Sequence, residues 1–210
     1  MNRTLRRIFP VLCLLPVLAQ AQQGAPDGEW PSYGGDLGHT RYSALEQIDA
    51  ANFSELKIAW RFKTDNLGPS PEYRFQATPL MVDGKIYTTA GSRRSVVALD
   101  AETGELLWHY SMNEGERGEY APRQLSGRGL AFWQEGDEAR VIYVTPGYQM
   151  VALDASSGLP VDSFGNNGVI DLKQNADQQI DPVTGEIGLH ATPIVAKDVV
   201  IVGAAHRTGG

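Results

Sequence analysis

Two segments of this chain, 54 residues apart, repeat the same pattern of apolar residues, an aspartate and a turn that ends in glycine. Residues 98–108 read ALDAETGELLW, and residues 152–158 read ALDASSG. In the first copy, the apolar residues before Asp100 are typical of a strand, Thr103-Gly104 of a tight turn, and the residues up to Trp108 of a returning strand. A strand–turn–strand unit repeated at this spacing predicts an array of small antiparallel sheets.

Short strand-like segments bounded by turn residues surround both copies. The first group is residues 78–82, 85–89, 96–100 and 106–110, the second is 129–133, 140–145, 150–154 and about 160–164, and the third begins with 190–195 and 199–203. Asp83-Gly84 is a two-residue hairpin signal. Four short antiparallel strands in about 40 residues are typical of one β-propeller blade. We therefore predict an all-β fold, a partial β-propeller of two to three blades. The sequence also predicts a short helix over 49–56, capped by Asp49, and a strand over 56–62.

The first 21 residues have the features of a secretory signal peptide. Arg3, Arg6 and Arg7 precede a short apolar run, and Ala19-Gln20-Ala21 is a cleavage site of the A-x-A type. Cys13, the only cysteine, lies within this segment, so the mature chain has no disulfide. We predict a signal peptide over 1–21, a flexible leader over 22–29 and the propeller over 30–210.

The charge balance argues against one class of partner. The signal segment holds three of the 18 Lys and Arg and none of the 25 Asp and Glu, so the rest of the chain has a net charge of −10. A surface with this acidic excess does not attract nucleic acid.

The pattern A-x-D-x-x-T-G-x-x-x-W resembles the tryptophan-docking repeat of pyrroloquinoline quinone (PQQ)-dependent dehydrogenases, which are eight-bladed propellers. In that family the Trp stacks between neighbouring blades, which is the role implied for Trp108, whereas Asp162 stands at the matching position of the second copy. The start of the chain, WPSYGGD at 30–36 and TRYS at 40–43, is similar to the start of the mature glucose and quinate quinoproteins. The resemblance spans 30–210 and implies an N-terminal part of a longer propeller, in which the strand near Trp60 belongs to the last blade. A complete four-bladed propeller is the alternative.

The resemblance also implies the residues that bind the cofactor. They are Gln76, ahead of Ala-Thr-Pro, Arg128, which pairs with the quinone or a carboxylate, Thr145, a hydroxyl donor, and His190, at the start of a later strand. Each of these residues also has a purely structural explanation. Gln76 and His190 can hydrogen-bond the free backbone groups at strand ends. Arg128 can join two neighbouring blades, and Thr145 can occur only because threonine favours strands. His206 lies near a loop where relatives hold calcium, although the expected Glu is not evident.

One difference from the family pattern indicates which branch of the family this chain resembles. Alcohol-oxidising members carry adjacent cysteines where this chain has Pro122 and Arg123. The resemblance therefore favours the glucose, quinate and polyol branch, which lacks that cysteine pair.

The implied reaction is oxidation of a sugar, polyol or related alcohol to its carbonyl product. PQQ is the implied oxidant, calcium the Lewis acid, and a quinone or cytochrome c the electron acceptor. The base and most calcium ligands are expected beyond residue 210, so no catalytic residue is assigned and residues 22–210 alone are expected to be inactive. The signal peptide implies a periplasmic location, with membrane association as an alternative. The alternatives are a non-catalytic periplasmic scaffold with the same repeats and a sugar- or peptide-binding propeller.

Overall fold

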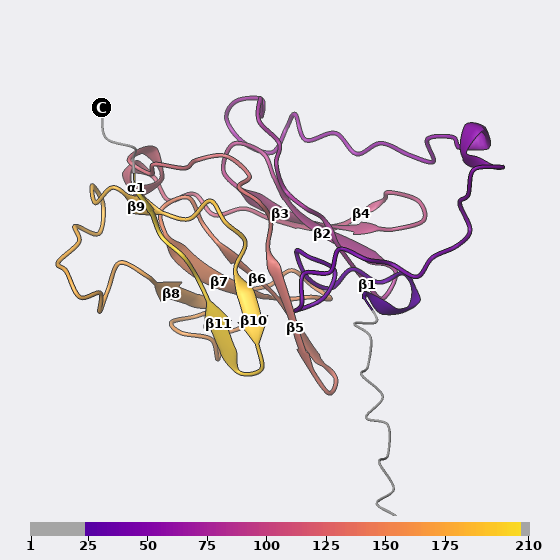
Figure 1. The fold of residues 1–210 in the computed structure, drawn as a ribbon. Helices are drawn as coiled ribbons and strands as arrows, with labels where there is room; N and C mark the ends of the chain where they lie inside the picture. The colour runs from indigo at the N-terminus through magenta and orange to yellow at the C-terminus, as the bar shows by residue number, and fades with distance from the viewer. Residues whose placement is uncertain (1–23, 207–210) are drawn as a thin grey trace, which may run out of the picture.

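The computed structural model describes residues 24–206, so the predicted signal peptide lies outside the described residues. Nearly all regular structure is antiparallel sheet, in separate small sheets that follow one another along the chain (Figure 1). The first sheet has the order β1-β2-β3-β4, with bounds Leu80–Val82, Lys85–Ala90, Ser95–Asp100 and Leu106–Tyr110. The second has the order β5-β6-β7-β8, with bounds Ala131–Glu135, Glu138–Val144, Gln149–Asp154 and Val169–Asp171.

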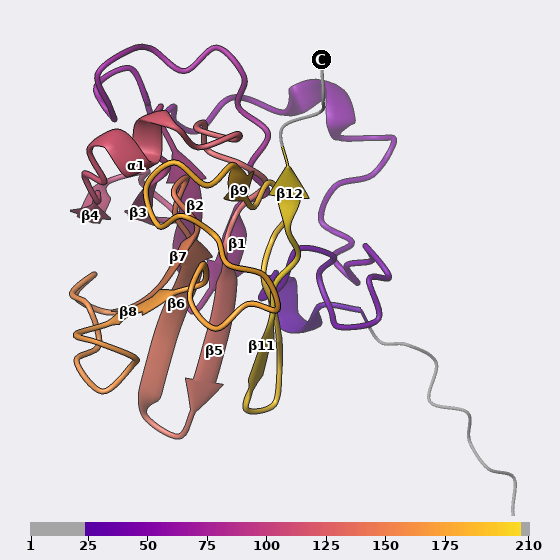
Figure 2. The same cartoon turned by 90° about the vertical axis from the view of Figure 1, so that its left-hand side faces the viewer.

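A third unit follows the second sheet. It comprises the hairpin of β10 (Ile194–Ala196) and β11 (Val199–Ile201), and the pair of β9 (Ile187–Gly188) with β12 (Ala205–His206). Figure 2 shows the β10–β11 hairpin beside β5, as the contacts between β10 and β5 require. Two complete blades and part of a third confirm the predicted partial propeller.

The second sheet is packed on both faces, and β6 shows how its sequence achieves this. Val141 and Tyr143 belong to the core shared with the first sheet, whereas Ile142 and Val144 belong to the core shared with the third unit. Because side chains alternate along a strand, a continuous apolar run such as Val141–Val144 serves two neighbours at once. The sheets are therefore held face to face by burial of apolar side chains.

Local turn chemistry fixes the hairpins. Asp83 and Gly84 both have positive φ, 50° and 70°, which is the type I′ geometry that joins β1 to β2 in register. In both repeat copies the aspartate closes the following turn: Asp100 Oδ1 accepts from the backbone N–H of Thr103 at 2.7 Å, and Asp154 Oδ1 from that of Ser157 at 2.8 Å. These bonds explain the predicted repeat in physical terms.

Tryptophans connect each turn to the preceding part of the structure. The indole N–H of Trp108 donates to the Ala155 carbonyl at 3.0 Å, and its ring lies over Gly158. Trp60 repeats the arrangement one unit earlier, with a 3.1 Å bond to the Ala101 carbonyl and its ring over Gly104. Any side chain at either glycine would collide with the ring, so the glycine of the motif is required by stacking as well as by its positive φ.

Three predicted elements differ in the structure. Residues 56–62 form no strand, because no described strand pairs with them; Ile58 is 66% exposed. The helix over 49–56 is shortened to a 3₁₀ turn, Phe53–Glu55, although Asp49 does accept from the Ala51 N–H at 2.7 Å.

The fourth strand of the second sheet is also displaced from the predicted 160–164. Pro160 bridges only to Leu153, and the chain then makes an excursion through residues with positive φ before it returns as β8. The turn residues Gly165, Asn167 and Gly168 form this excursion.

The N-terminal loop, residues 30–43, closes against the free edge of β1. Trp30 exchanges backbone hydrogen bonds with Met81 at 2.7 and 3.1 Å, and Glu29 accepts from the Asp83 N–H. The residues 24–29, expected to form a leader, include the 3₁₀ turn η1 (Pro26–Gly28). The other helix, α1 (Glu116–Glu119), lies between the first two sheets in sequence. No helix in the described part of the chain is long and apolar enough to cross a membrane.

Candidate functional site

The first strands of the three units, β1, β5 and β10, are called the inner strands here. The residues just before them meet at the backbone of Arg128. The Arg128 carbonyl accepts from the Thr78 N–H at 3.0 Å and from the Thr192 hydroxyl at 3.2 Å. Thr78 precedes β1, Arg128 precedes β5 and Thr192 precedes β10. Gly129 has a φ of 126° and approaches the Thr78 carbonyl so closely that a Cβ would lie at 3.0 Å. The residues just ahead of these strands are thus brought together from three blades.

Gln76 and His190, predicted as cofactor residues from sequence, are in direct contact. His190 Nε2 lies 2.9 Å from Gln76 Oε1. Because an amide oxygen only accepts, Nε2 carries the proton, which leaves Nδ1 as an acceptor when the ring is neutral. The amide nitrogen of Gln76 then remains as a donor for a ligand.

The surroundings of this pair are positively charged. Burial lowers the pKa of His190 below its usual value, and the charges of Arg94, Arg128, Arg123 and Arg74 lower it further. The ring is therefore neutral at pH 7, and its neighbourhood favours an anion. Arg128, the third predicted residue, has an exposed side chain and contributes to this field.

A cavity of about 440 Å³ opens beside His190. Most of the residues that line it come from the segments before β1 and β5, among them Tyr73, Arg74, Pro122, Arg123 and Gln124, and Ser92 joins them from the turn between β2 and β3. Pro122 and Arg123 occupy the positions where alcohol-oxidising relatives were expected to carry cysteines. A cavity with two arginines and a histidine in its wall suits a ligand with several carboxylates.

Thr145, the fourth predicted residue, is placed differently. Its hydroxyl donates to Glu114 Oε1 at 2.7 Å and accepts from the Gln149 N–H at 3.0 Å, and the residue is fully buried. Glu114 also accepts from the Gly147 N–H at 2.7 Å. These bonds hold the turn between β6 and β7, and the hydroxyl of Thr145 is engaged by Glu114 and Gln149 and not by Gln76 or His190.

Sequence reasoning missed Arg74, Arg94 and Arg123. Arg74 and Arg123 could have been found from their positions a few residues ahead of the inner strands, the same signal that identified Gln76. Arg94 follows a hairpin turn far from the other residues in sequence, and no local pattern distinguishes it from its exposed neighbour Arg93.

No group of three or more His, Cys, Asp or Glu suited to a metal ion exists within residues 24–206. His206 lies in β12, where its backbone pairs with Ile187. Arg207, the residue after it, lies outside the described residues.

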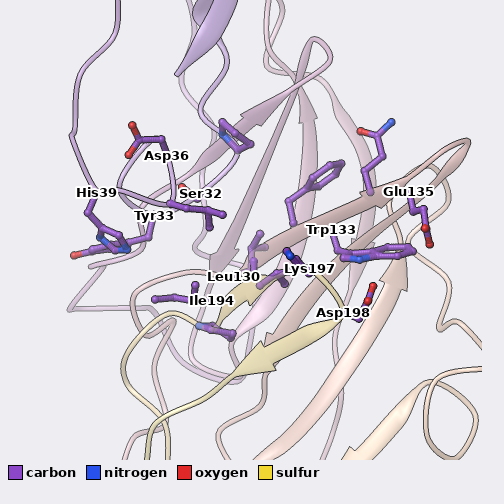
Figure 3. Close-up of a pocket in the computed structure, with 17 residues that line it drawn as sticks. Ser32, Tyr33, Asp36, His39, Leu130, Trp133, Glu135, Ile194, Lys197 and Asp198 are labelled. Atoms are coloured by element: carbon purple, nitrogen blue, oxygen red, sulfur yellow. The ribbon is translucent and has the colours of Figure 1, made fainter. Parts of the chain in front are cut away.

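A second cavity, of about 410 Å³, lies between the N-terminal loop and the inner strands β5 and β10 (Figure 3). Tyr33, Asp36 and His39 line it from the loop, and Trp133 and Glu135 line it from β5. Asp36 is occupied in shaping the loop, since it accepts from the Thr40 N–H and hydroxyl at 2.9 and 2.7 Å. None of the four predicted cofactor residues lines this cavity, so we assign the candidate site to the cavity beside His190.

Four-stranded blades joined through docked tryptophans define the chain as part of a β-propeller. Within that class, it belongs to the family described as PQQ: glucose/ethanol/alcohol dehydrogenase, beta-propeller domain, which matches residues 30–209.

Relatives and solved structures agree with this membership. The chain is 32% identical to the quinohemoprotein alcohol dehydrogenase ADH IIB of Pseudomonas putida, over 97% of this chain and 28% of that protein. It is 27% identical to the glycerol dehydrogenase large subunit of Gluconobacter oxydans (strain 621H), over 90% of this chain and 26% of that protein. The crystal structure of the quinohemoprotein alcohol dehydrogenase from Comamonas testosteroni superposes with a TM-score of 0.67 at 28% identity, covering 88% of this chain and 24% of that one. The chain thus spans about a quarter of the length of the relatives it matches.

Proposed function

We propose that this chain forms part of the cofactor wall of a PQQ-dependent dehydrogenase that oxidises a sugar, polyol or related alcohol to its carbonyl product. The observation that carries the proposal is the Gln76–His190 pair beside a cavity walled by arginines. Electrons would pass to a quinone or cytochrome c. The signal peptide predicted over 1–21 makes export to the periplasm part of the same proposal.

The residues present fit the cofactor. PQQ is a small, planar tricarboxylate. Arg74 and Arg123 line the cavity with guanidinium donors that suit carboxylates, and the exposed Arg128 adds its positive charge nearby. Gln76 offers its amide N–H groups, since its oxygen already accepts from His190. When bound, PQQ supplies the oxidising equivalents for the alcohol.

The chain's own residues orient this ligand and hold a proton. His190 is kept neutral by burial and by neighbouring cations, so it donates from Nε2 to Gln76 and presents Nδ1 as an acceptor. Calcium belongs to the proposal as the Lewis acid, but the described residues hold no group of ligands for it. The base is likewise assigned to no residue of this chain.

The direct test is titration of the apo-protein, produced from its complete gene, with PQQ, followed by dye reduction with glucose, quinate, glycerol and ethanol in the presence of calcium. We expect saturable PQQ binding and turnover of a sugar or polyol, with binding weakened by Arg128→Ala. A protein that binds no PQQ would be a non-catalytic propeller. Residues 22–210 alone are expected to give no dye reduction.

A further inference from the structure

Arg94 lies between the blades and bonds to the backbone of several segments at once. It directly precedes the buried part of β3 and is only 3% exposed. Its Nε donates to the Leu125 carbonyl at 2.9 Å and its Nη2 to the Arg123 carbonyl at 2.9 Å. Its Nη1 donates to the carbonyls of Val144 at 2.9 Å and Leu189 at 2.8 Å. One side chain thus joins the first blade to four carbonyls of the segments that follow.

The charge of this guanidinium has no ion-pair partner. Among residues 24–206 no carboxylate lies in ion-pair contact with Arg94, unlike Lys85–Asp83, Arg117–Asp171 and Arg140–Glu138, and the hydrogen bonds of its guanidinium all go to backbone carbonyls. Glu114 and Glu72 are near enough to favour its charge, but each carboxylate accepts hydrogen bonds from other groups. Burial lowers the pKa of Arg94 to about 10, so it remains protonated at neutral pH. A buried charge left in this state costs free energy that a neutral donor would not.

The backbone of Arg94 also departs from what its residue type prefers. Its φ is 51°, in the left-handed region where glycine or asparagine is the ordinary choice. An arginine at such a position is explained when its side chain is needed, because the backbone alone would be easier to form with glycine.

Three of the four carbonyls, those of Arg123, Leu125 and Leu189, belong to residues that line or directly adjoin the candidate site. Leu189 directly precedes His190, and Arg123 lines the cavity beside it. Gly127, the residue before Arg128, packs against the guanidinium so closely that a Cβ would lie 3.2 Å from its central carbon. The contacts of Arg94 therefore fix the position of the backbone segments that carry Arg128 and His190.

We infer that Arg94 is a positioning residue for the cofactor wall: its guanidinium aligns the strand starts that carry Arg128 and His190, and its unpaired charge strengthens the attraction of the cavity for an anionic ligand. The inference rests on the proposed function, since the ligand is the carboxylate-bearing cofactor proposed above. A purely structural tie between blades is the competing explanation, and it requires the hydrogen bonds but not the charge.

The test uses the protein from its complete gene with Arg94→Lys, which keeps the charge, Arg94→Met, which removes it, and Arg93→Met, a control at the exposed neighbour. PQQ dissociation constants are measured at about 0.02 M and about 0.5 M salt, where charge effects are respectively weakly and strongly screened. Amide hydrogen exchange of residues 121–129 and 189–193 is measured in the apo-proteins.

We expect Arg94→Met to weaken PQQ binding about tenfold at low salt and less at high salt. Arg94→Lys should bind with a smaller loss and the wild-type salt dependence, both Arg94 variants should exchange faster in the two segments, and Arg93→Met should match wild type. Equal losses for both Arg94 variants at both salt concentrations would identify a structural tie and overturn the inference, as would wild-type binding by Arg94→Met.

Two further outcomes are decided by the same measurements. If Arg94→Met does not fold, Arg94→Lys decides, and unchanged exchange together with unchanged binding in that variant overturns the inference. If the wild-type protein binds no PQQ, the proposed function fails and the charge effect inferred for Arg94 fails with it. The alignment of the two strand starts by Arg94 is then tested by exchange in the apo-proteins, and unchanged exchange in both segments overturns it.

Discussion

The imidazole Nε2 of His190 lies 2.9 Å from the amide oxygen of Gln76, although 114 residues separate them in sequence. The two residues occupy equivalent places, each two residues before the Thr-Pro that leads into an inner strand. Their contact shows that equivalent positions of the first and third units converge at one site. With the amide oxygen of Gln76 facing the ring, Nε2 of the neutral histidine is the donor.

We expect Gln76→Glu to weaken PQQ binding about tenfold. The new carboxylate would favour a protonated His190 and would repel a carboxylate of the cofactor, where the amide of Gln76 can donate to it. Equilibrium titration of the apo-protein measures the change. Gln178→Glu adds the same charge at an exposed loop residue and should leave the affinity unchanged. Equal affinities for wild type and Gln76→Glu would contradict the assigned role.

The lowered pKa of His190 predicts a pH dependence of stability. Because burial and the nearby arginines disfavour protonation in the folded state, the unfolded state binds more protons around its ordinary value of 6.5. The free energy of unfolding should therefore decrease as pH falls below about 6.5. Anion binding should oppose this decrease, so PQQ affinity should rise over the same interval.

Denaturant titrations of wild type and His190→Gln between neutral and mildly acidic pH test this prediction. The variant should show a shallower loss of stability on acidification. His109→Gln is the comparison, because the pKa of His109 in β4 is lowered in the same sense by desolvation, without the arginines. A PQQ affinity that is independent of pH in wild type would show that protonation of His190 is not coupled to binding of the ligand.

The ion pair between Arg117 and Asp171 ties α1 to β8 and should be visible in acid stability. Arg117 donates to both carboxylate oxygens, and this contact lowers the pKa of Asp171 below its usual value. The contribution is present above the unfolded value near 3.8 and is lost as pH falls through the folded pKa. Asp171→Asn should cost about 1–3 kcal/mol at pH 7 and flatten the stability profile at acid pH. Asp162→Asn, at an exposed aspartate of the same blade, should change neither; equal profiles for wild type and Asp171→Asn would refute this role for the ion pair.

The parts of the fold that could be predicted from sequence are those with local causes. Asp83-Gly84 determines its own hairpin, and Asp100 and Asp154 close the turns that follow them, whatever the rest of the chain does. The predicted strand over 56–62 is absent, because alternating apolar and polar residues form a strand only where a neighbouring strand pairs with them. The strand predicted near 160–164 was wrong in position because the chain first turns through Gly165, Asn167 and Gly168 and pairs with β7 only afterwards, as β8.

The residues of the candidate site likewise include some that could be predicted from sequence and some that could not. Gln76 and His190 share a recognisable strand start, so their equivalence could be read from sequence. The bonds of Thr145 to Glu114 could not, because a threonine at the end of a strand looks the same whether it faces a ligand or a neighbouring carboxylate. The role of Arg94 depends on four carbonyls brought together only by the stacking of blades.

The contact of Trp108 with Gly158 should account for much of the coupling between the first two blades. The indole hydrogen-bonds to the Ala155 carbonyl, and the ring occupies the space where a side chain at residue 158 would stand, 2.5 Å from a Cβ. Trp108→Ala should lower the free energy of unfolding by about 3 kcal/mol, since a large, partly buried ring is lost. Trp108→Phe should cost about 1 kcal/mol, the hydrogen bond alone.

Gly158→Ala tests the same contact from the other side. In wild type the added methyl collides with the ring and also suffers from the φ of 72°, whereas in the Trp108→Ala background only the backbone penalty remains. The two substitutions should therefore be non-additive, with the double variant more stable than the sum of the single effects by about 1 kcal/mol or more. Gly136→Ala is the control, because that glycine also has positive φ but no atom within 4 Å of a Cβ. Additive effects in denaturant titrations of the four proteins would show that the ring does not hold the blades together through this glycine.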